Sequence, residues 1–95
     1  MQPPIEREIL RPLWKVHILH HAAEGPVVGN WLLGELREHG YRVSPGTLYP
    51  LLGRMVRLRW LMQGTDRRYR ITPGGRQVLK VVRNRLRELQ DEVFA

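Results

Sequence analysis

Two pairs of residues, Ser44-Pro45 and Thr72-Pro73, limit the folds open to this chain of 95 residues. In each pair a residue with a side-chain hydroxyl comes directly before a proline. A serine or threonine side chain can cap the free amides at the start of a helix, and proline fits the first turn because its missing N–H is not needed there. Each pair therefore predicts the start of a helix. Gly25-Pro26 and Gly40 are helix stops, so these signals divide the chain into four helical segments.

The predicted helices run from Pro3 to about Ala23 and over residues 28–39, 45–58 and 73–95. Residues 60–63 and 67–71 read as two short strands around a turn, because apolar and basic residues alternate in the second of them. We therefore predict a mainly α fold with a small β-hairpin. Residues 1–73 would form a winged helix-turn-helix DNA-binding domain, and residues 74–95 a C-terminal dimerisation helix, in one structural domain overall.

The charge of the chain favours a polyanionic partner. Lys and Arg number 16 against 9 Asp and Glu, which gives a net charge of +7 and a pI near 11.0. No acidic residue lies between Glu38 and Asp66, a stretch that contains four arginines. Nucleic acid is the expected partner, and a solvated basic face without a partner is the alternative.

The third predicted helix has an unusual outer face. Its leucines and Met55 fall on one side, and the opposite side carries Gly46, Pro50, Gly53 and Arg57. A glycine inside a helix costs about 1 kcal/mol against alanine, and proline removes an internal hydrogen bond. A helix that enters the DNA major groove gains from small residues on its outer face, because they let the backbone and flanking arginines approach the DNA.

The last predicted helix carries an apolar seam at spacings of 3, 4, 3 and 4 residues, which is typical of a coiled coil. The helix would be about 34 Å long at about 1.5 Å per residue, longer than a domain this small can cover. We predict that the seam meets another subunit, together with two residues of the first helix. The predicted dimerisation residues are Ile9, Leu13, Leu79, Val82, Leu86, Leu89 and Val93.

Two stretches, Ser44 to Met55 and Arg68 to Arg76, resemble the signature of the PadR-like transcriptional regulators. This resemblance implies a winged helix domain, a homodimer joined through the terminal helices, and repression or other control of promoters that carry inverted repeats. It also implies DNA contacts from Ser44, Thr47 and Tyr49 and from an arginine-rich wing. With the basic residues around them, the predicted DNA-binding residues are Arg42, Ser44, Thr47, Tyr49, Arg54, Arg57, Arg67 and Arg68.

Two departures from the family pattern affect details of this resemblance. The family usually has glycine at the end of the recognition helix, where this chain has Arg59, and a Gly-Tyr pair in the second helix, where it has Asn30-Trp31. Arg59 implies a different helix exit or an added phosphate contact. Trp31 would fill the space of the tyrosine.

Other functions fit the sequence less well. No nucleophile motif, Gly-rich phosphate loop or paired histidine and carboxylate is visible, and the chain has no cysteine, so we expect neither an enzyme nor a cofactor. No signal peptide or membrane span is visible, so we expect a cytoplasmic location and no membrane partner. The alternative function is a winged-helix protein-interaction module without specific DNA binding.

The first helix has a second apolar face with Leu10, Trp14, His17 and His21. Relatives in the family bind phenolic or drug-like molecules between subunits, so the resemblance implies a candidate effector site for a planar aromatic molecule at Trp14, His17 and His21. The i, i+4 spacing of the two histidines also suits a metal ion, but no third ligand is in view, so no metal is predicted. In the alternative, Trp14 is a dimer-core residue and the histidines are satisfied or solvated.

Overall fold

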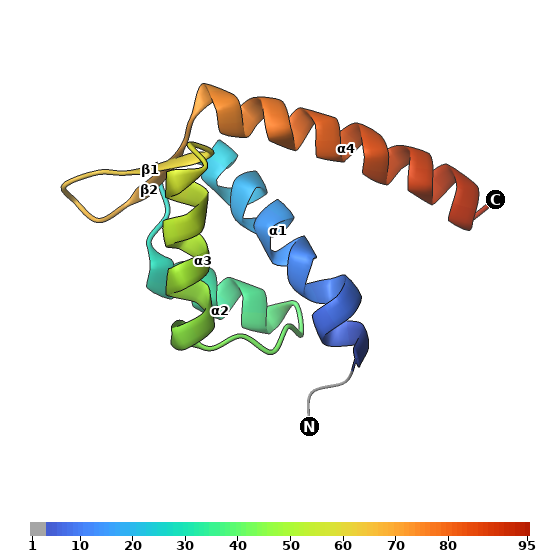
Figure 1. The fold of residues 1–95 in the computed structure, drawn as a ribbon, viewed down its shortest axis with the longest axis horizontal. Helices are drawn as coiled ribbons and strands as arrows, with labels where there is room; N and C mark the ends of the chain where they lie inside the picture. The colour runs from blue at the N-terminus through green and yellow to red at the C-terminus, as the bar shows by residue number, and fades with distance from the viewer. Residues whose placement is uncertain (1–3) are drawn as a thin grey trace.

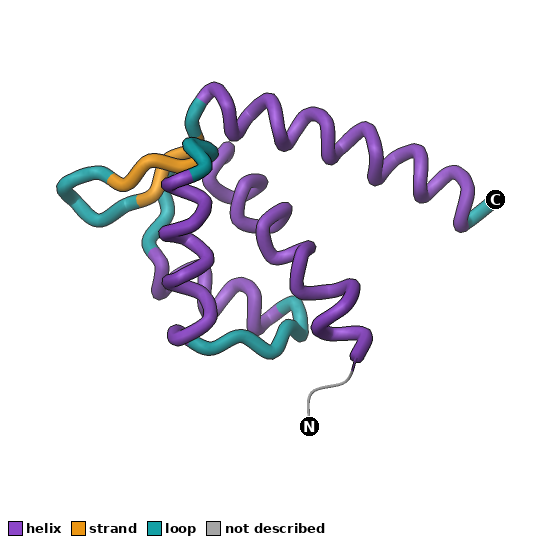
Figure 2. The backbone as a smooth tube through the Cα atoms, in the orientation of Figure 1, coloured by secondary structure: helices purple, strands orange, loops and turns teal. Residues whose placement is uncertain are grey.

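The computed structural model describes residues 4–95, so Pro3, the expected start of the first helix, lies outside the described residues. A π-helical turn, η1 (Glu6–Leu10), continues into α1 (Arg11–Glu24). The other elements are α2 (Gly29–Glu38), α3 (Pro45–Arg57), β1 (Leu61–Gln63), β2 (Tyr69–Ile71) and α4 (Pro73–Val93). The predicted mainly α fold with one hairpin is confirmed, with α1 lying between α4 and the α2–α3 pair (Figure 1). Figure 2 shows the hairpin projecting from the helices.

The core forms where α1, α2 and α3 pack together. Trp14 and Ile18 of α1 are fully buried, and so are Leu32 and Leu36 of α2. The inner face of α3 contributes Leu48, Leu52 and Met55, also fully buried. This inward apolar face leaves the opposite side of α3 free to meet another molecule.

The hairpin is tied to the connection between α1 and α2. Strands β1 and β2 are antiparallel, with Leu61 opposite Ile71 and Gln63 opposite Tyr69. Val27 forms an additional bridge to Tyr69, in which each backbone amide donates to the other residue's carbonyl, at 3.0 Å and 2.7 Å. This pairing fixes the hairpin beside the start of α2.

Helix α3 ends with an arginine in a left-handed conformation. Arg59 has φ of 64°, its amide donates to Val56 O at 2.9 Å, and the Trp60 amide donates to Met55 O at 3.0 Å. These two bonds form the helix end that glycine favours. The expectation of a different helix exit is therefore wrong: Arg59 adopts the glycine conformation, at a cost of about 1–2 kcal/mol.

Helix α4 starts in close contact with the segment after α3. The Thr72 hydroxyl accepts from Gly75 N at 2.9 Å, as predicted for a cap, and donates to Arg59 O. A Cβ at Gly75 would lie 2.1 Å from Trp60 O, so only glycine fits there. Beyond Leu79 no residue of α4 is buried, and the helix extends away from the domain (Figure 1). No helix among residues 4–95 is both long and apolar enough to cross a membrane.

Candidate nucleic-acid interface

The glycines on the outer face of α3 are not required by close packing, because a larger residue would fit at each position. A Cβ at Gly46 would have Ser44 Oγ as its nearest neighbour, at 3.8 Å, and a Cβ at Gly53 would have Arg57 Nη1, at 3.5 Å. Both distances are ordinary van der Waals contacts. Packing inside the domain therefore does not require glycine at either position.

The start of α3 leaves its backbone amides without a side-chain cap. Ser44 is the N-cap residue, but its hydroxyl makes no cap bond and instead lies 3.1 Å from the Thr47 hydroxyl. The expectation that Ser44 caps the helix is therefore wrong. The Thr47 and Leu48 amides donate to Ser44 O instead, at 3.0 Å and 2.9 Å, and the helix dipole favours an anion at this end.

Tyr49 is held on the outer face of α3 by the start of α2. Its side chain is 45% exposed. A Cβ at Gly29 would lie 2.6 Å from Tyr49 Cε1, so the phenol ring lies directly on the glycine backbone. Burial raises the pKa of the nearby Tyr69, and the neighbouring Tyr49 raises it further.

A buried glutamate holds the loop that leads into α3. Glu6 of η1 is only 6% exposed, and its Oε1 accepts from the Arg42 amide at 3.2 Å. On the other side of the loop, Arg37 Nε donates to Val43 O at 3.0 Å. The backbone at Arg42 is therefore fixed while its side chain is exposed. Local sequence patterns do not reveal the role of Glu6, because this role depends on a contact 36 residues away along the chain.

The hairpin tip carries two exposed arginines and one carboxylate that is paired with a third arginine. Arg70 Nη2 donates to Asp66 Oδ2 at 2.9 Å, and the Arg68 amide donates to Asp66 Oδ1 at 3.1 Å. These bonds hold the pKa of Asp66 far below its usual range. Arg67 has φ of 65°, the left-handed conformation that glycine favours in such turns. Arg67 and Arg68 are exposed at the tip, next to a carboxylate whose charge is already matched.

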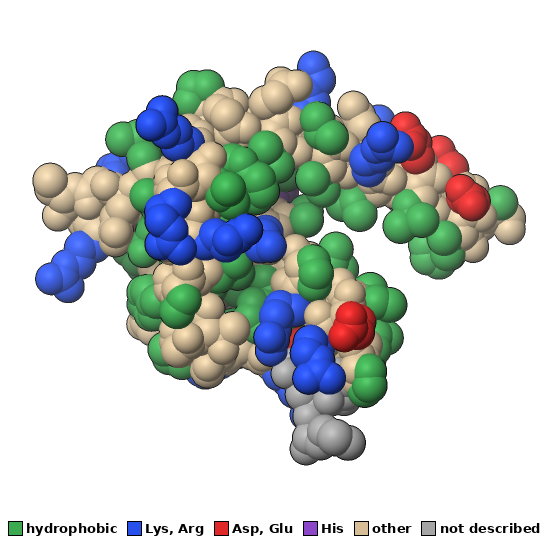
Figure 3. Space-filling view, in the orientation of Figure 1, with side chains coloured by type: hydrophobic (Ala, Val, Ile, Leu, Met, Phe, Trp, Pro, Cys, Tyr) green, Lys and Arg blue, Asp and Glu red, His purple; other side chains and the backbone are tan. Residues whose placement is uncertain are grey.

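Figure 3 shows Lys and Arg side chains over α3 and at the hairpin tip, while acidic side chains in this view lie mainly towards the C-terminal end of α4. The structure places every predicted DNA-binding residue at the surface. Thr47 is half-buried, and Arg42, Ser44, Tyr49, Arg54, Arg57, Arg67 and Arg68 are exposed. Positive charge, small residues and the start of α3 therefore share one region, an arrangement that suits contact with a phosphate backbone.

Comparison with known proteins assigns this arrangement to a family. Residues 18–81 match the family model described as the transcriptional regulator PadR-like family. The chain belongs to the PadR-like family of transcriptional regulators. It is 50% identical over 95 residues to the transcriptional regulator Rv3488 of Mycobacterium tuberculosis, an alignment that covers 93% of this chain and 89% of that protein. This is a family of regulators rather than of enzymes.

Solved structures of PadR-like proteins share the fold. One from Bacillus cereus has a TM-score of 0.79 and 26% identity, with 90% of this chain and 92% of that chain covered. One from Bacteroides fragilis has a TM-score of 0.75 and 21% identity, with 96% of each chain covered. The winged-helix arrangement of this PadR-like chain is therefore that of its relatives.

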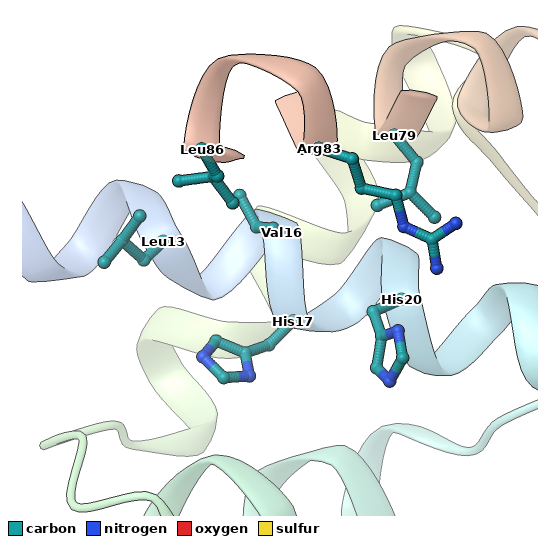
Figure 4. A pocket seen from close by; sticks show the side chains of 7 residues that line it. All are labelled: Leu13, Val16, His17, His20, Leu79, Arg83 and Leu86. Carbon is teal, nitrogen blue, oxygen red and sulfur yellow. The ribbon is translucent and has the colours of Figure 1, made fainter. Parts of the chain in front are cut away.

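The predicted dimerisation residues of the PadR-like chain divide into three groups by their exposure. Ile9, Leu86, Leu89 and Val93 are large apolar side chains exposed by 40% or more, and Leu13 and Val82 are half-buried. Leu79 is only 5% exposed, so its assignment to an interface is wrong: it packs in the core of its own chain. A cavity of about 360 Å³ lies between parts of α1 and α4, and its lining residues are Leu13, Val16, His17, His20, Leu79, Arg83 and Leu86 (Figure 4).

The predicted aromatic effector site is not open in this chain. Trp14 is 0% exposed, so its indole ring cannot stack on a ligand, and the expectation that it forms an open face is wrong. The centroid of its ring lies 6.3 Å from the centroid of the Tyr41 ring. His17 Nε2 lies 2.8 Å from Tyr41 Oη, and His21 lies between Glu24 and Glu35. The spacing of apolar residues identifies an apolar face here. It does not reveal that other parts of the same domain cover this face.

Proposed function

We propose that this PadR-like regulator binds double-stranded DNA sequence-specifically as a homodimer, with α3 in the major groove and the β1–β2 hairpin on the adjacent backbone. The observation that carries the proposal is the outer face of α3. It is small and basic, and the domain's own packing does not explain its glycines. Its exposed side chains are those a groove-binding helix needs.

The side chains on this surface suit different contacts. The hydroxyls of Ser44 and Thr47 lie at the start of α3, where they can donate hydrogen bonds to phosphate oxygens and either donate to or accept from base edges. Arg54 and Arg57 lie on the later turns, and arginine is the side chain that pairs best with guanine in the major groove. Arg67 and Arg68 at the hairpin tip suit phosphate or the minor groove.

The two left-handed arginines support the same proposal. Among residues 4–95, Arg59 and Arg67 are the only non-glycine residues with positive φ. Glycine would remove the strain at either position, so retaining arginine at both indicates that the positive charge has a use. Both lie at the edges of the α3 and hairpin surface, where an added phosphate contact would form.

The exposed apolar strip on α4 supports the homodimer. Leu86, Leu89 and Val93 belong to the predicted seam, and among residues 4–95 they are 40%, 55% and 63% exposed. Ile9 on η1 is 60% exposed. A second copy offers the same strip and would bury both, and a two-fold dimer would match an inverted-repeat operator. We further propose that the dimer acts in the cytoplasm as a repressor, by occupying the promoter.

Salt-dependent DNA binding tests the proposal. A duplex selected from genomic fragments should bind the dimer, and the logarithm of the association constant should fall linearly with the logarithm of salt concentration, with a slope set by the number of phosphate contacts. A scrambled duplex of the same length should bind much more weakly. Equal binding to both duplexes would instead support the protein-interaction alternative, with only non-specific charge attraction to DNA.

A further inference from the structure

A cluster of three histidines and one glutamate lies where α1 faces α2, away from the outer face of α3. His17 and His21 are one turn apart on α1, and Glu35 and His39 are one turn apart at the end of α2. Ring nitrogens of the three histidines all lie within 4.8 Å of one another. Glu35 Oε1 lies 3.6 Å from His21 Nε2 and 3.6 Å from His39 Nε2. We infer that these four side chains bind one divalent transition-metal ion of the zinc class.

His21 is oriented as a metal ligand. Its Nε2 is buried and has no hydrogen-bond partner among the described residues, whereas Nδ1 lies 3.3 Å from Glu24 Oε1. A neutral imidazole has one N–H and one lone pair. With the proton on Nδ1 facing Glu24, the Nε2 lone pair faces the cluster. A carboxylate behind a ligating histidine fixes its tautomer and raises its basicity.

His17 has a comparable second partner. Its Nε2 lies 2.8 Å from Tyr41 Oη, which leaves Nδ1 as the nitrogen available to an ion. Burial lowers the pKa of His17, and the nearby His39 and His21 lower it further. A histidine binds a metal ion through its neutral ring, so this environment favours the binding form of His17.

The ligand set and spacing select the metal. Bonds of about 2.0–2.1 Å in a tetrahedral site place the ligand atoms about 3.3 Å apart. The two Glu35 distances of 3.6 Å are already close to this value. The longer histidine separations can shorten by side-chain rotation, since His39 is 46% exposed. Three imidazoles and a carboxylate suit Zn²⁺, Co²⁺ or Ni²⁺ better than the oxygen-seeking Mg²⁺ or Ca²⁺.

A second group, His20, His21 and Glu24, shares one histidine with this cluster. His20 and Glu24 are 47% and 65% exposed, and all three residues lie on one helix. The cluster with His39 and Glu35 takes ligands from two helices and is more buried. His39 and His20 therefore distinguish the two groups, since each belongs to only one of them.

Calorimetric titration of the metal-free full chain with Zn²⁺ tests the site, with Co²⁺ absorption as a spectroscopic measure of tetrahedral coordination. We expect one ion per chain. His39→Ala and Glu35→Gln should each weaken binding about tenfold or more, while His20→Ala should change it by less than about twofold. Circular dichroism of each variant checks that the helices remain.

Thermal unfolding gives an independent measurement, because an ion that binds only the folded chain raises the melting temperature. Zn²⁺ should raise it for the wild type and His20→Ala, but much less for His39→Ala. Failure of the wild type to bind Zn²⁺ stoichiometrically would overturn the inference. A greater loss in His20→Ala than in His39→Ala would overturn the assignment of these ligands.

Discussion

The phenol ring of Tyr49 on α3 lies on the backbone of Gly29 at the start of α2, with no room for a Cβ between them. We predict that Gly29→Ala displaces the Tyr49 side chain and lowers DNA affinity about as much as Tyr49→Ala does. The double variant should be no weaker than either single variant, because the two changes act on one contact. Binding to the selected duplex, measured by fluorescence anisotropy, gives all three values.

Gly34→Ala is the matched control on α2. Nothing lies within 4 Å of a Cβ at Gly34, so this substitution should stabilise the helix and leave DNA binding unchanged. A Gly29→Ala variant with wild-type affinity would show that Tyr49 does not contact DNA from its present position.

Gly53→Ala should separate stability from binding. A Cβ at Gly53 meets only Arg57 Nη1, at 3.5 Å, so alanine fits and should raise the free energy of unfolding by about 1 kcal/mol. If this face of α3 is pressed against DNA, the same methyl group should weaken the complex several-fold. Urea unfolding and duplex titration measure the two effects. A variant that is more stable and binds DNA normally would place the DNA elsewhere.

Arg59→Gly should also stabilise the protein and weaken DNA binding. Glycine removes the strain of φ 64°, so we expect unfolding to require about 1 kcal/mol more. Loss of one phosphate contact should make the salt dependence of binding shallower by about one unit of slope. Arg59→Lys is the control, since it keeps both the charge and the strain. An unchanged salt slope in the glycine variant would exclude a phosphate contact by Arg59.

Gly75→Ala should destabilise the junction between the winged domain and α4. Its Cβ would lie 2.1 Å from Trp60 O, a backbone atom that cannot move alone, so we expect a loss of about 3 kcal/mol in unfolding free energy. Gly74→Ala is the control, because its Cβ would lie 3.3 Å from Arg59 O and needs only a small shift. Similar melting temperatures for the two variants would contradict this account.

Leu89→Asp should prevent dimerisation, because it places a charge without a partner in the proposed seam. Leu89 is 55% exposed in the single chain, so the variant should stay folded. Asn84→Asp, on the opposite side of α4, is the control and should remain dimeric. Light scattering at micromolar concentration distinguishes the two states, and a monomeric wild type would rule out the proposed dimer.

The sequence predicted the features that depend on local chemistry. Thr72-Pro73 starts a helix because its cap and its proline act within one turn. Leu79 and Trp14 were misassigned because periodicity shows that a face is apolar, but not whether the same chain or a partner covers it. The contact of His39 with His17 and His21 depends on how α2 packs against α1, so spacing along the sequence could not reveal it.

The hydrogen bond from the Arg42 amide to the Glu6 carboxylate ties η1 to the loop that enters α3. The support for this loop is therefore not confined to the helix-turn-helix itself. Trimming the chain past residue 6 would remove this bond to the loop, even with every proposed DNA-contacting side chain intact. A change of partner preference could thus arise from the N-terminal end, without any substitution on the recognition surface.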